Sequence, residues 1–462
     1  MSGRYQAYPE YKDSGVEWLG KIPNNWMFAD LRRGIKLLTD FEANGSFAEV
    51  KNNVNLDTEE KYAWYLRATD LENNRLGIVE GNRTCDRNAY NYLSKTKLFG
   101  GEFLVAKRGE IGKIYVVPEL PSKTTLAPNL YLIRLNEHLN SKFVYYWYSS
   151  SYGNPELILA DKSTTIGALY KDDVKSCKIL FPNINDQEKI VNFLDHETAK
   201  IDTLIEKQQQ LIKLLKEKRQ AVISHAVTKG LNPNVKMKDS GIEWLGEVPE
   251  HWKVKPLKCV CNLIDGDRSS VYPNESELVD DGIPFVSSKN IVNYKLTKNN
   301  LNYITEQKFA KLSRGKLVAG DLVITVRGTI GHVGIFDPVI IGCETGFINA
   351  QMMIIRPSKG LTDYIQLVSE SSLWQSQLEV LAYGSTVKQL SNEVLGNISI
   401  AIPSFDELSN FVNDVKKCCE KIEHLIFRAQ SAVELLQERR TALISAAVTG
   451  KIDVRNFKAT GD

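Results

Sequence analysis

Six loops of the sequence combine basic side chains with hydroxyls and amides, the groups that bind phosphate oxygens and base edges. Three of these loops lie in the first half of the chain and three in the second half. The candidate contact residues of the first half are Arg67, Thr69, Lys107, Arg108, Lys113, Thr164 and Thr165. Those of the second half are Lys289, Asn290, Arg327, Thr329, Ser385, Thr386 and Lys388. Their types predict contact with nucleic acid, without separating base contacts from phosphate contacts.

The two arginines that precede a glycine, Arg108 and Arg327, are the strongest candidates. Glycine permits close approach of the backbone, and a guanidinium can bind guanine or phosphate through two parallel hydrogen bonds. The alternative for each is an arginine at a strand turn that pairs with a local carboxylate. For the serine and threonine loops the alternative is simple turn capping. The sequence leaves these alternatives open.

Catalytic motifs are not found beside these loops. An adenine methyltransferase needs Asn/Asp-Pro-Pro-aromatic, but Asn232-Pro233 and Asp337-Pro338 lack the second proline. There is no G-x-x-x-x-G-K-[ST] phosphate loop, and the acid-x-Lys triplet at Asp173 has no preceding Pro-Asp, as a nuclease would have. The six histidines form no pair with a nucleophile. We therefore expect a chain that is not an enzyme, and a free-standing nuclease is the least favoured interpretation.

Composition sets further limits. Cys259-x-Cys261 and Cys418-Cys419 lack the paired Cys-x-x-Cys spacing of tetrahedral zinc, so no metal site is predicted. Seven scattered cysteines fit reduced thiols, and neither a signal peptide nor an apolar run of about 20 residues is found, so we expect a cytoplasmic protein with no membrane contact. Because the net charge is only +2, any nucleic-acid contact must come from local patches.

The chain repeats itself. The stretch from Lys12 to Trp26 returns from Lys238 to Trp252, at a shift of 226 residues. A second frame, G-acid-three apolar-x-Arg-Gly-x-Ile-Gly, begins at Gly101 and again at Gly320. A third match pairs Thr164 onward with Ser385 onward at a shift of 221 that persists to Thr228 and Thr449. Three ordered matches at nearly constant shift indicate a duplicated unit of about 220 residues.

Each unit joins two kinds of segment. The first part contains short β-branched runs bounded by Gly, Pro or Asn, which predicts a mixed, strand-rich α+β domain. The last part has helical periodicity: Asp186 to Thr228 contains no Gly or Pro. A heptad pattern predicts coiled-coil contacts, which we also expect to serve partner binding, at Ile201, Leu204, Leu211, Leu215, Ile422, Leu425, Leu436 and Leu443. Lys218 and Arg439 interrupt the two patterns at matching places.

Forty-three residues of helix extend roughly 65 Å, longer than a small domain is wide. Each helix could pack on its own domain, but two similar apolar stripes in one chain favour pairing with each other. Only Lys229 to Lys236 separate the first helix from the second domain, so the second helix must run back along the first. The connection predicts antiparallel helices that hold the two domains apart, and a pseudo-two-fold tandem repeat.

Together these features resemble a known family. The K-D-S-G-[VI]-E-W-L-G-x-[IV]-P-x-x-W stretch, the Arg-Gly frame and the Pro182, Asp186, Gln187 start of a long helix are similar to the specificity subunit of type I restriction-modification systems. The resemblance covers nearly the whole chain. It is looser at Pro403, which Glu407-Leu408 follow in place of acid-Gln. It divides the chain into target-recognition domains at 1–183 and 231–403 and helical spacers at 184–230 and 404–455.

The resemblance implies recognition of a bipartite, asymmetric sequence in double-stranded DNA. It also implies binding of two methyltransferase subunits and of restriction (motor) subunits. S-adenosylmethionine, ATP and magnesium are then expected on those partners, and no cofactor on this chain. A coiled-coil scaffold that binds proteins and not DNA is the alternative function. Trp18, Trp26, Trp244 and Trp252 could be taken for base-stacking platforms, but their Gly and Pro neighbours favour a packed segment.

Overall fold

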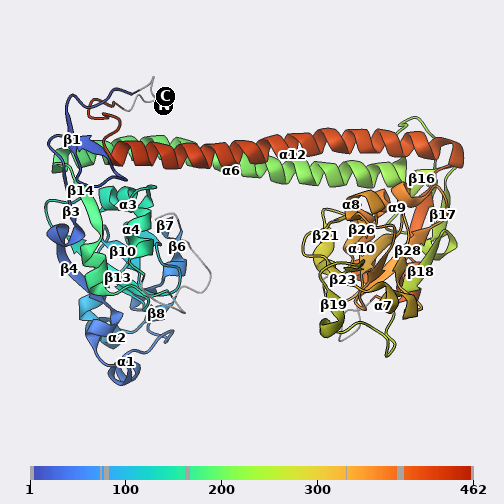
Figure 1. The fold of residues 1–462 in the computed structure, drawn as a ribbon, viewed down its shortest axis with the longest axis horizontal. Coiled ribbons are helices and arrows are strands. Elements are labelled where there is room, and N and C mark those ends of the chain that lie inside the picture. Colours follow the sequence, from blue (N-terminus) through green and yellow to red (C-terminus); the bar gives the residue numbers. More distant parts are fainter. Residues whose placement is uncertain are drawn as a thin grey trace. The chain divides into compact units, whose positions relative to one another are not determined.

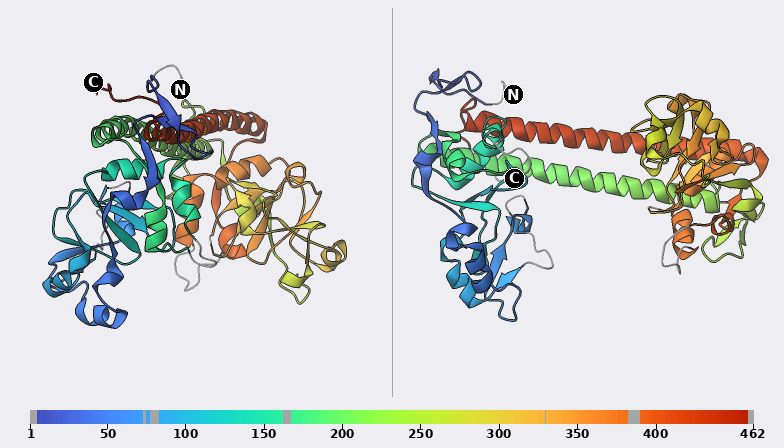
Figure 2. Two further views of the ribbon diagram at one scale, coloured as in Figure 1. Left: turned by 60° about the vertical axis from the view of Figure 1, so that its left-hand side comes forward. Right: turned by 60° about the horizontal axis from the view of Figure 1, so that its bottom comes forward.

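The computed structural model describes residues 5–72, 75–76, 83–161, 167–328, 330–381 and 390–458. The chain forms two compact units (Figures 1 and 2). Unit 1 comprises Met1–Gln208 and Ser431–Asp462, and unit 2 comprises Gln209–Gln430. Each unit contains one mixed domain and one segment of each of the two long helices.

The mixed domain of unit 1, called domain 1, is built on an antiparallel sheet of order β11-β10-β13-β4. Its strands are β4 (Ile35–Asp40), β10 (Phe103–Ala106), β11 (Ile114–Val116) and β13 (Leu130–Leu135). Phe103 on β10 and Trp147 on helix α3 (Ser141–Ser149) are fully buried, so this sheet and helix enclose one core. The remaining helices are α1 (Phe47–Asn53), α2 (Arg87–Tyr92), α4 (Asn154–Leu159) and α5 (Lys171–Ser176).

A second sheet of domain 1 has the order β8-β5-β12-β9, and its strands β5 and β12 run parallel. The strands are β5 (Ala63–Leu66), β8 (Thr84–Cys85), β9 (Lys97–Leu98) and β12 (Thr124–Leu126). Three two-stranded pairs complete the domain: β1 (Tyr11–Asp13) with β2 (Lys21–Pro23), β3 (Met27–Asp30) with β14 (Lys178–Phe181), and β6 (Leu71–Glu72) with β7 (Arg75–Leu76). Strand β14 leads directly into the first long helix.

Domain 2 repeats this plan in unit 2. Its larger sheet has the order β18-β28-β25-β26-β22-β21, and the other sheet has the order β19-β23-β20-β27-β24 with β20 and β27 parallel. The strands of the first are β18 (Cys261–Asp265), β21 (Ile291–Val292), β22 (Lys295–Leu296), β25 (Leu322–Thr325), β26 (Val333–Ile335) and β28 (Met352–Pro357). Those of the second are β19 (Leu278–Val279), β20 (Ile283–Val286), β23 (Asn302–Ile304), β24 (Lys316–Leu317) and β27 (Gly346–Ile348). The α+β prediction is confirmed.

Short pairs and helices complete domain 2. The pairs are β15 (Met237–Asp239) with β16 (Glu247–Pro249) and β17 (Lys253–Pro256) with β29 (Ser399–Ile402). The helices are α7 (Glu306–Lys311), α8 (Pro338–Ile341), α9 (Thr362–Ser369), α10 (Ser372–Leu381) and α11 (Asn392–Gly396). Seven short 3₁₀ turns lie among the described residues of the two domains.

The two long helices are α6 (Ile184–Lys229) and α12 (Phe405–Val448). The Asn183 side chain accepts a hydrogen bond from the Asp186 amide at 2.8 Å and so caps the start of α6. Just beyond their ends, Gly230 and Gly450 have φ of 75° and 71°. A Cβ at Gly450 would lie only 2.4 Å from Pro23 Cγ, so this helix end requires a glycine for space as well as for its left-handed backbone.

Within each unit the segments of α6 and α12 run antiparallel, as predicted. In unit 1, Asp202 of α6 pairs with Arg440 of α12 at 2.8 Å, while Phe193, earlier in α6, contacts Phe457 beyond the end of α12. In unit 2, Arg219 pairs with Glu423 at 3.0 Å. Gly230, after α6, faces Trp252, whose ring contacts Phe411 near the start of α12. In both units, moving forward along one helix means moving backward along the other.

The predicted seam, meaning the residues with which α6 and α12 face each other, was partly wrong. Ile201, Ile422 and Leu443 are 5%, 6% and 3% exposed, whereas Leu204, Leu211 and Leu425 are 46%, 43% and 48% exposed. The less exposed residues are instead those one position further along each helix, Ile205, Ile212 and Ile426. In the same way, Arg219 and Arg440 are less exposed than Lys218 and Arg439. Leu215 and Leu436 are partly buried. Steps of three and four residues both fit helical periodicity, so the sequence did not distinguish position 204 from 205.

Each domain is attached to both long helices of its unit. In unit 1 the Ser151 and Ser445 hydroxyls lie 3.0 Å apart, and in unit 2 the Ser372 and Ser224 hydroxyls lie 2.9 Å apart. These residues occupy equivalent positions, because each pair of counterparts is separated by the repeat shift of 221. Since α6 continues from domain 1 and α12 from domain 2, the serine bonds add an attachment to the other helix.

Candidate nucleic-acid interface

Three loops of domain 1 meet at one place, and we call them loop cluster 1: residues 67–70, 107–113 and 167–169. The Leu169 amide donates to the Lys107 carbonyl at 3.0 Å, and the Lys107 amide donates to the Asn129 carbonyl at 2.8 Å. The Ala127 amide in turn donates to the Leu66 carbonyl at 2.8 Å, next to the first loop. The β12–β13 turn therefore joins the loops that the sequence proposed separately.

Loop cluster 2 repeats the arrangement in domain 2 with residues 287–290, 326–328, 330–331 and 390–391. The Leu390 amide donates to the Val326 carbonyl at 3.1 Å, and the Val326 amide donates to the Gln351 carbonyl at 2.9 Å. The Asn349 amide donates to the Val286 carbonyl at 2.9 Å. The same connected loops thus occur twice, each cluster lying where the parallel strand pair of its domain ends.

Sequence reasoning missed the joining turns, 127–129 and 349–351. Pro128-Asn129 and Asn349-Ala350 stand between two apolar runs, which is a turn signal, and Asn129 has a left-handed φ of 75°. It also missed Arg268, an exposed residue whose guanidinium donates to the Ala350 carbonyl at 3.3 Å. This cation lies beside loop cluster 2 although it is far from that cluster in the sequence.

Arg67 is held by the carboxylate of Asp70. Its guanidinium donates to the two Asp70 oxygens at 3.2 and 2.8 Å, and Asp70 also accepts from the Arg67 amide at 2.8 Å. The hydrogen bond to Asp70 raises the pKa of Arg67 above its usual value. This arginine is bonded to a local carboxylate, yet its side chain stays 38% exposed, while Thr69 is exposed beside it.

Lys107 lies inside an ion-pair network. Its ammonium is 2.7 Å from both Asp40 and Glu42, and its side chain is only 11% exposed. Burial disfavours the charges of Lys107 and Asp40, but their hydrogen bonds outweigh it, so the pKa of Lys107 is raised and that of Asp40 is lowered. Lys171 adds a second cation 3.0 Å from Asp40. Lys107 therefore organises the base of loop cluster 1.

Arg108 and Lys113 extend outward from the same loop. Arg108 is 59% exposed, and its carboxylate neighbour within the described part of the chain is Glu42, at 3.8 Å. Lys113 is 56% exposed and pairs with the exposed Glu110 of the same loop. Exposed pairs of this kind are weak and exchange readily for other anions. Arg108 is thus the cation of loop cluster 1 that is best placed to meet a phosphate or a base.

In loop cluster 2 the prediction for Asn290 was wrong. Asn290 is 1% exposed, its oxygen accepts from the Ser287 amide and hydroxyl at 2.8 and 3.0 Å, and its amide donates to the Asn299 carbonyl at 3.0 Å. It caps the loop from within, as Asp70 does in domain 1, and a buried amide cannot reach DNA. Of the predicted contacts that the structure describes in this cluster, Lys289 and Arg327 are exposed.

Six predicted contacts lie outside the described residues: Thr164, Thr165, Thr329, Ser385, Thr386 and Lys388. The loops that contain them adjoin the clusters in sequence, since Gly167 and Leu390 are bonded to the Arg-Gly loops. Their contribution stays a prediction.

The tryptophans divide into two kinds. Trp26 and Trp252 are 0% and 2% exposed, as expected for a packed segment. The same interpretation was wrong for Trp18 and Trp244, which are 46% and 40% exposed. The neighbouring Leu19 and Leu245 take the buried positions instead.

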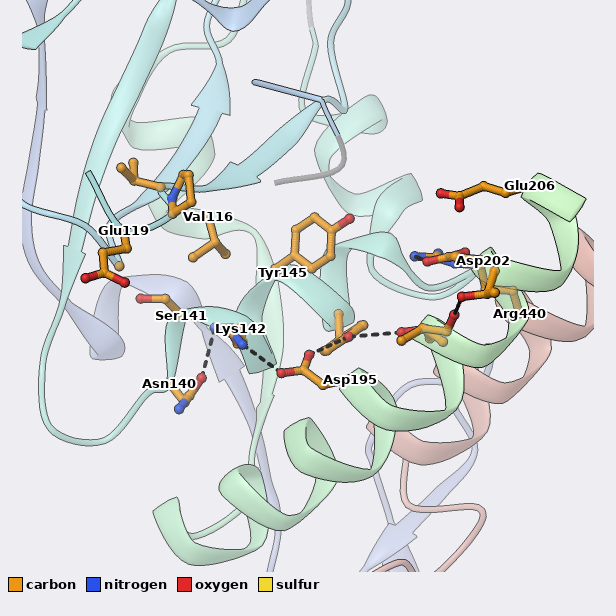
Figure 3. A pocket seen from close by; sticks show the side chains of 17 residues that line it. Val116, Glu119, Asn140, Ser141, Lys142, Tyr145, Asp195, Asp202, Glu206 and Arg440 are labelled. Atoms are coloured by element: carbon orange, nitrogen blue, oxygen red, sulfur yellow. Dashed lines mark hydrogen bonds and ion pairs between the residues drawn. The ribbon is translucent and has the colours of Figure 1, made fainter. Parts of the chain in front are cut away.

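A polar groove of about 910 Å³ lies in unit 1 (Figure 3). Lys142 and Tyr146 of α3 both bond Asp195 of α6 at 2.7 Å, and Arg440 bonds Asp202. These charges are paired with each other, so the groove joins α3 to the long helices. Within the described residues, no three His, Cys, Asp or Glu side chains form a group able to hold a metal ion. Nor is any described helix long and apolar enough to cross a membrane.

The family model for the type I restriction modification DNA specificity domain matches this chain twice, at residues 41–214 and 249–433. The chain belongs to the type I restriction-modification DNA specificity family. The two matches carry the two loop clusters and enter both long helices. This match decides for a DNA specificity subunit and against the protein-binding scaffold.

The chain is similar to several specificity subunits of type I restriction enzymes. The type I restriction enzyme MjaVIII specificity subunit of Methanocaldococcus jannaschii is 24% identical over 365 residues, 77% of each chain. The EcoKI specificity subunit of Escherichia coli K12 is 25% identical over 217 residues, 46% of each chain. A solved structure described as the basis of complex assembly and conformational transition of the type I R-M system has a TM-score of 0.69. At 16% identity it covers 93% of this chain and 99% of its own, which shows a common fold.

Proposed function

We propose that this specificity subunit reads a bipartite, asymmetric sequence in double-stranded DNA, with loop cluster 1 contacting one part and loop cluster 2 the other. The observation that carries the proposal is one loop framework, built twice, that presents different side chains. Loop cluster 1 exposes Thr69, Arg108 and Lys113. Loop cluster 2 exposes Lys289 and Arg327, and the exposed Arg268 lies beside it. Since direct readout depends on the donors and acceptors presented to the groove, different side chains select different sequences.

The long helices then set the spacing between the two recognised parts. At 1.5 Å per residue the 46 residues of α6 extend roughly 70 Å, about two turns of B-form DNA. A change in helix length by whole turns is expected to change the number of unread base pairs and not the bases that are read.

The chain performs no catalytic step in this proposal. Two methyltransferase subunits supply S-adenosylmethionine and the methyl transfer, and restriction subunits supply ATP-driven movement, with magnesium. The exposed apolar residues of the helices are the proposed docking positions. Unit 1 presents Leu204 and Leu435, at 46% and 65% exposure. Unit 2 presents Leu211, Leu214, Leu425 and Phe427, at 43% to 64% exposure.

A domain exchange tests the proposal. Residues 27–180 are replaced by those of another specificity subunit, and methylated adenines are mapped by sequencing in cells that also contain the methyltransferase. The expected result is a target with one part changed, one part kept and the spacing unchanged. A target changed in both parts, or in neither, would contradict the assignment of one part to each cluster.

A further inference from the structure

Two surface turns of nearly identical sequence expose one tryptophan each. The turns are Asp13–Gly20 and Asp239–Gly246, called tryptophan turn 1 and tryptophan turn 2. Their sequences differ only at Val16 and Ile242. Trp18 is 46% exposed in the first and Trp244 is 40% exposed in the second.

The backbone of each turn is fixed without its tryptophan. The Ser14 amide donates to the Gly20 carbonyl at 2.9 Å, and the Ser240 amide donates to the Gly246 carbonyl at 3.0 Å. The Asp13 and Asp239 side chains accept from the next-but-one glycine amides at 2.7 and 2.9 Å. Leu19 and Leu245, 4% and 7% exposed, anchor the turns in their domains.

The residues before the tryptophans are also exposed and not required for the turn. Glu17 and Glu243 are exposed carboxylates, and neither has an ion pair among the described residues. A tryptophan next to a carboxylate without an ion pair among the described residues therefore recurs at two positions where the hydrogen bonds of the turn do not involve it. The exposed residues of the loop clusters, by contrast, differ between the domains. Since the hydrogen bonds of the turns do not require the same Glu-Trp pair, its presence in both turns indicates that both contact the same partner surface.

The Trp18 side chain is held in one orientation. Its ring contacts the edge of Phe28 at 5.6 Å and stacks on Tyr152 at 6.2 Å. Lys451 lies over the Tyr152 ring at 4.6 Å and completes the support. A large aromatic group that is already ordered loses little conformational freedom when it binds, which is the property of interface hot spots.

Charge favours a protein partner over DNA. Each turn carries two carboxylates, Asp13 with Glu17 and Asp239 with Glu243, which would repel phosphates. The one lysine of the second turn's strand, Lys238, already donates to the Glu250 and Trp252 carbonyls at 2.6 and 2.8 Å. The surroundings of tryptophan turn 2 are therefore unsuited to a nucleic-acid backbone, and at tryptophan turn 1 the flanking Lys12 and Lys21 only balance the two carboxylates.

We infer that Trp18 and Trp244 are twin anchors for two copies of one protein, each copy enclosing the indole in an apolar pocket with a cation at its rim for Glu17 or Glu243. This assignment rests on the proposed function, in which the protein that binds in two copies is the methyltransferase subunit. The two anchors account for two copies per specificity subunit.

Native mass spectrometry of the full chain with its methyltransferase subunit tests the inference. We expect two copies on the wild type, one on Trp18→Ala, one on Trp244→Ala and none on the double variant at the same concentration. Each substitution should weaken its own site about 30-fold or more, the range of interface hot spots. Phe99→Ala, which removes a ring that is 70% exposed outside both turns and outside the long helices, is the control and should bind two copies.

Charge variants and DNA binding provide the second arm. Glu17→Lys with Glu243→Lys keeps both rings and should weaken binding about tenfold or more. A double tryptophan variant that keeps wild-type circular dichroism and still binds two copies would overturn the inference. Loss of salt-dependent DNA affinity in the chain alone, with methyltransferase binding retained, would instead show DNA contacts and equally overturn it. Failure of the wild type to bind methyltransferase would contradict the proposed function itself.

Discussion

The contacts that attach domain 1 to its long helices and those that attach domain 2 are partly the same and partly different. The serine contacts are kept, Ser151 with Ser445 and Ser372 with Ser224. A nearby ion pair is kept in position but reversed in charge: Lys142 with Asp195 in unit 1, and Asp363 with Lys416 in unit 2, each at 2.7 Å. All these counterparts are related by the shift of 221 residues. Duplication preserved where the domain meets the helix, while either polarity of charge satisfies the contact.

The two arginines of the seam keep their ion pair with the other helix, but their contacts with the domains differ. Arg440 and Arg219 are counterparts, and each pairs with a counterpart acid of the other helix, Asp202 or Glu423. Only Arg219 also binds an acid from its domain, Glu370, which is 5% exposed. The equivalent position in unit 1 is Ser149. Burial raises the pKa of Glu370 even though Arg219 opposes the shift. At this position domain 2 supplies a buried carboxylate to the seam arginine, whereas domain 1 has the uncharged Ser149.

We expect the greatest difference in the free energy of unfolding between a substitution in the seam and one on the exposed face of the same helix. Ile201→Asp places an unpaired charge at a buried position and should lower the free energy of unfolding by about 3 kcal/mol or more. Leu204→Asp, three residues on, should change it by less than about 0.5 kcal/mol. Urea unfolding followed by circular dichroism measures both. Equal losses would contradict the assignment of positions 201 and 205 to the seam.

The arginines should differ almost as strongly. Arg219→Ala leaves Glu370 buried and unpaired, with an expected loss of about 3–5 kcal/mol. Arg440→Ala leaves only Asp202, whose side chain is 46% exposed, with a loss of about 1 kcal/mol or less. Glu370→Gln in the Arg219→Ala background should restore part of the stability. Comparable losses for the two arginines would show that Glu370 does not distinguish the units.

The network under loop cluster 1 gives a pH-dependent comparison. Hydrogen bonds lower the pKa of Asp40, so its contribution is present above the unfolded pKa of about 3.9 and is lost as pH falls through the lower folded pKa. Asp40→Asn should cost about 2–3 kcal/mol at pH 7, and this deficit should shrink below about pH 4. Asp265, the counterpart in β18, accepts a hydrogen bond from the Asn392 side chain at 2.7 Å and has no ion pair among the described residues, so Asp265→Asn should cost about 1 kcal/mol or less. Melting temperatures across pH measure this difference, and a constant Asp40→Asn deficit would refute it.

The smallest effect concerns the reversed ion pair. Lys142→Asp or Asp195→Lys alone should cost about 1 kcal/mol or less, because the two side chains are 55% and 40% exposed. The double variant reproduces the polarity of unit 2 and should recover most of that loss. A double-mutant cycle by urea unfolding measures the coupling. A coupling of zero would show that the pair is not a determinant of the attachment.

The loops and helices show how far sequence reasoning reached. The duplication and the mixed domains followed from repeated motifs and periodicity, and the antiparallel helices followed from the short connection at Lys229–Lys236. The structure confirmed the mixed domains, and within each unit the antiparallel direction. Asn290 was misassigned because a turn asparagine can face either inward or outward, and the register of the backbone decides which. Leu204 was misassigned because the face of a helix that becomes buried depends on its neighbour. The joining turns and Arg268 escaped notice because no local pattern places residue 268 beside residue 350.

The features that could be predicted from the sequence are periodic or repeated along the chain. They are two copies of one domain, two long helices, and a family resemblance carried by short motifs. Only the tertiary structure decided which side chains are already paired and which are free. Lys107 lies in an ion-pair network while Arg108 stays exposed, and Leu19 is buried while Trp18 is not. Periodicity is a property of neighbours along the chain, whereas pairing and burial depend on groups that folding brings from elsewhere.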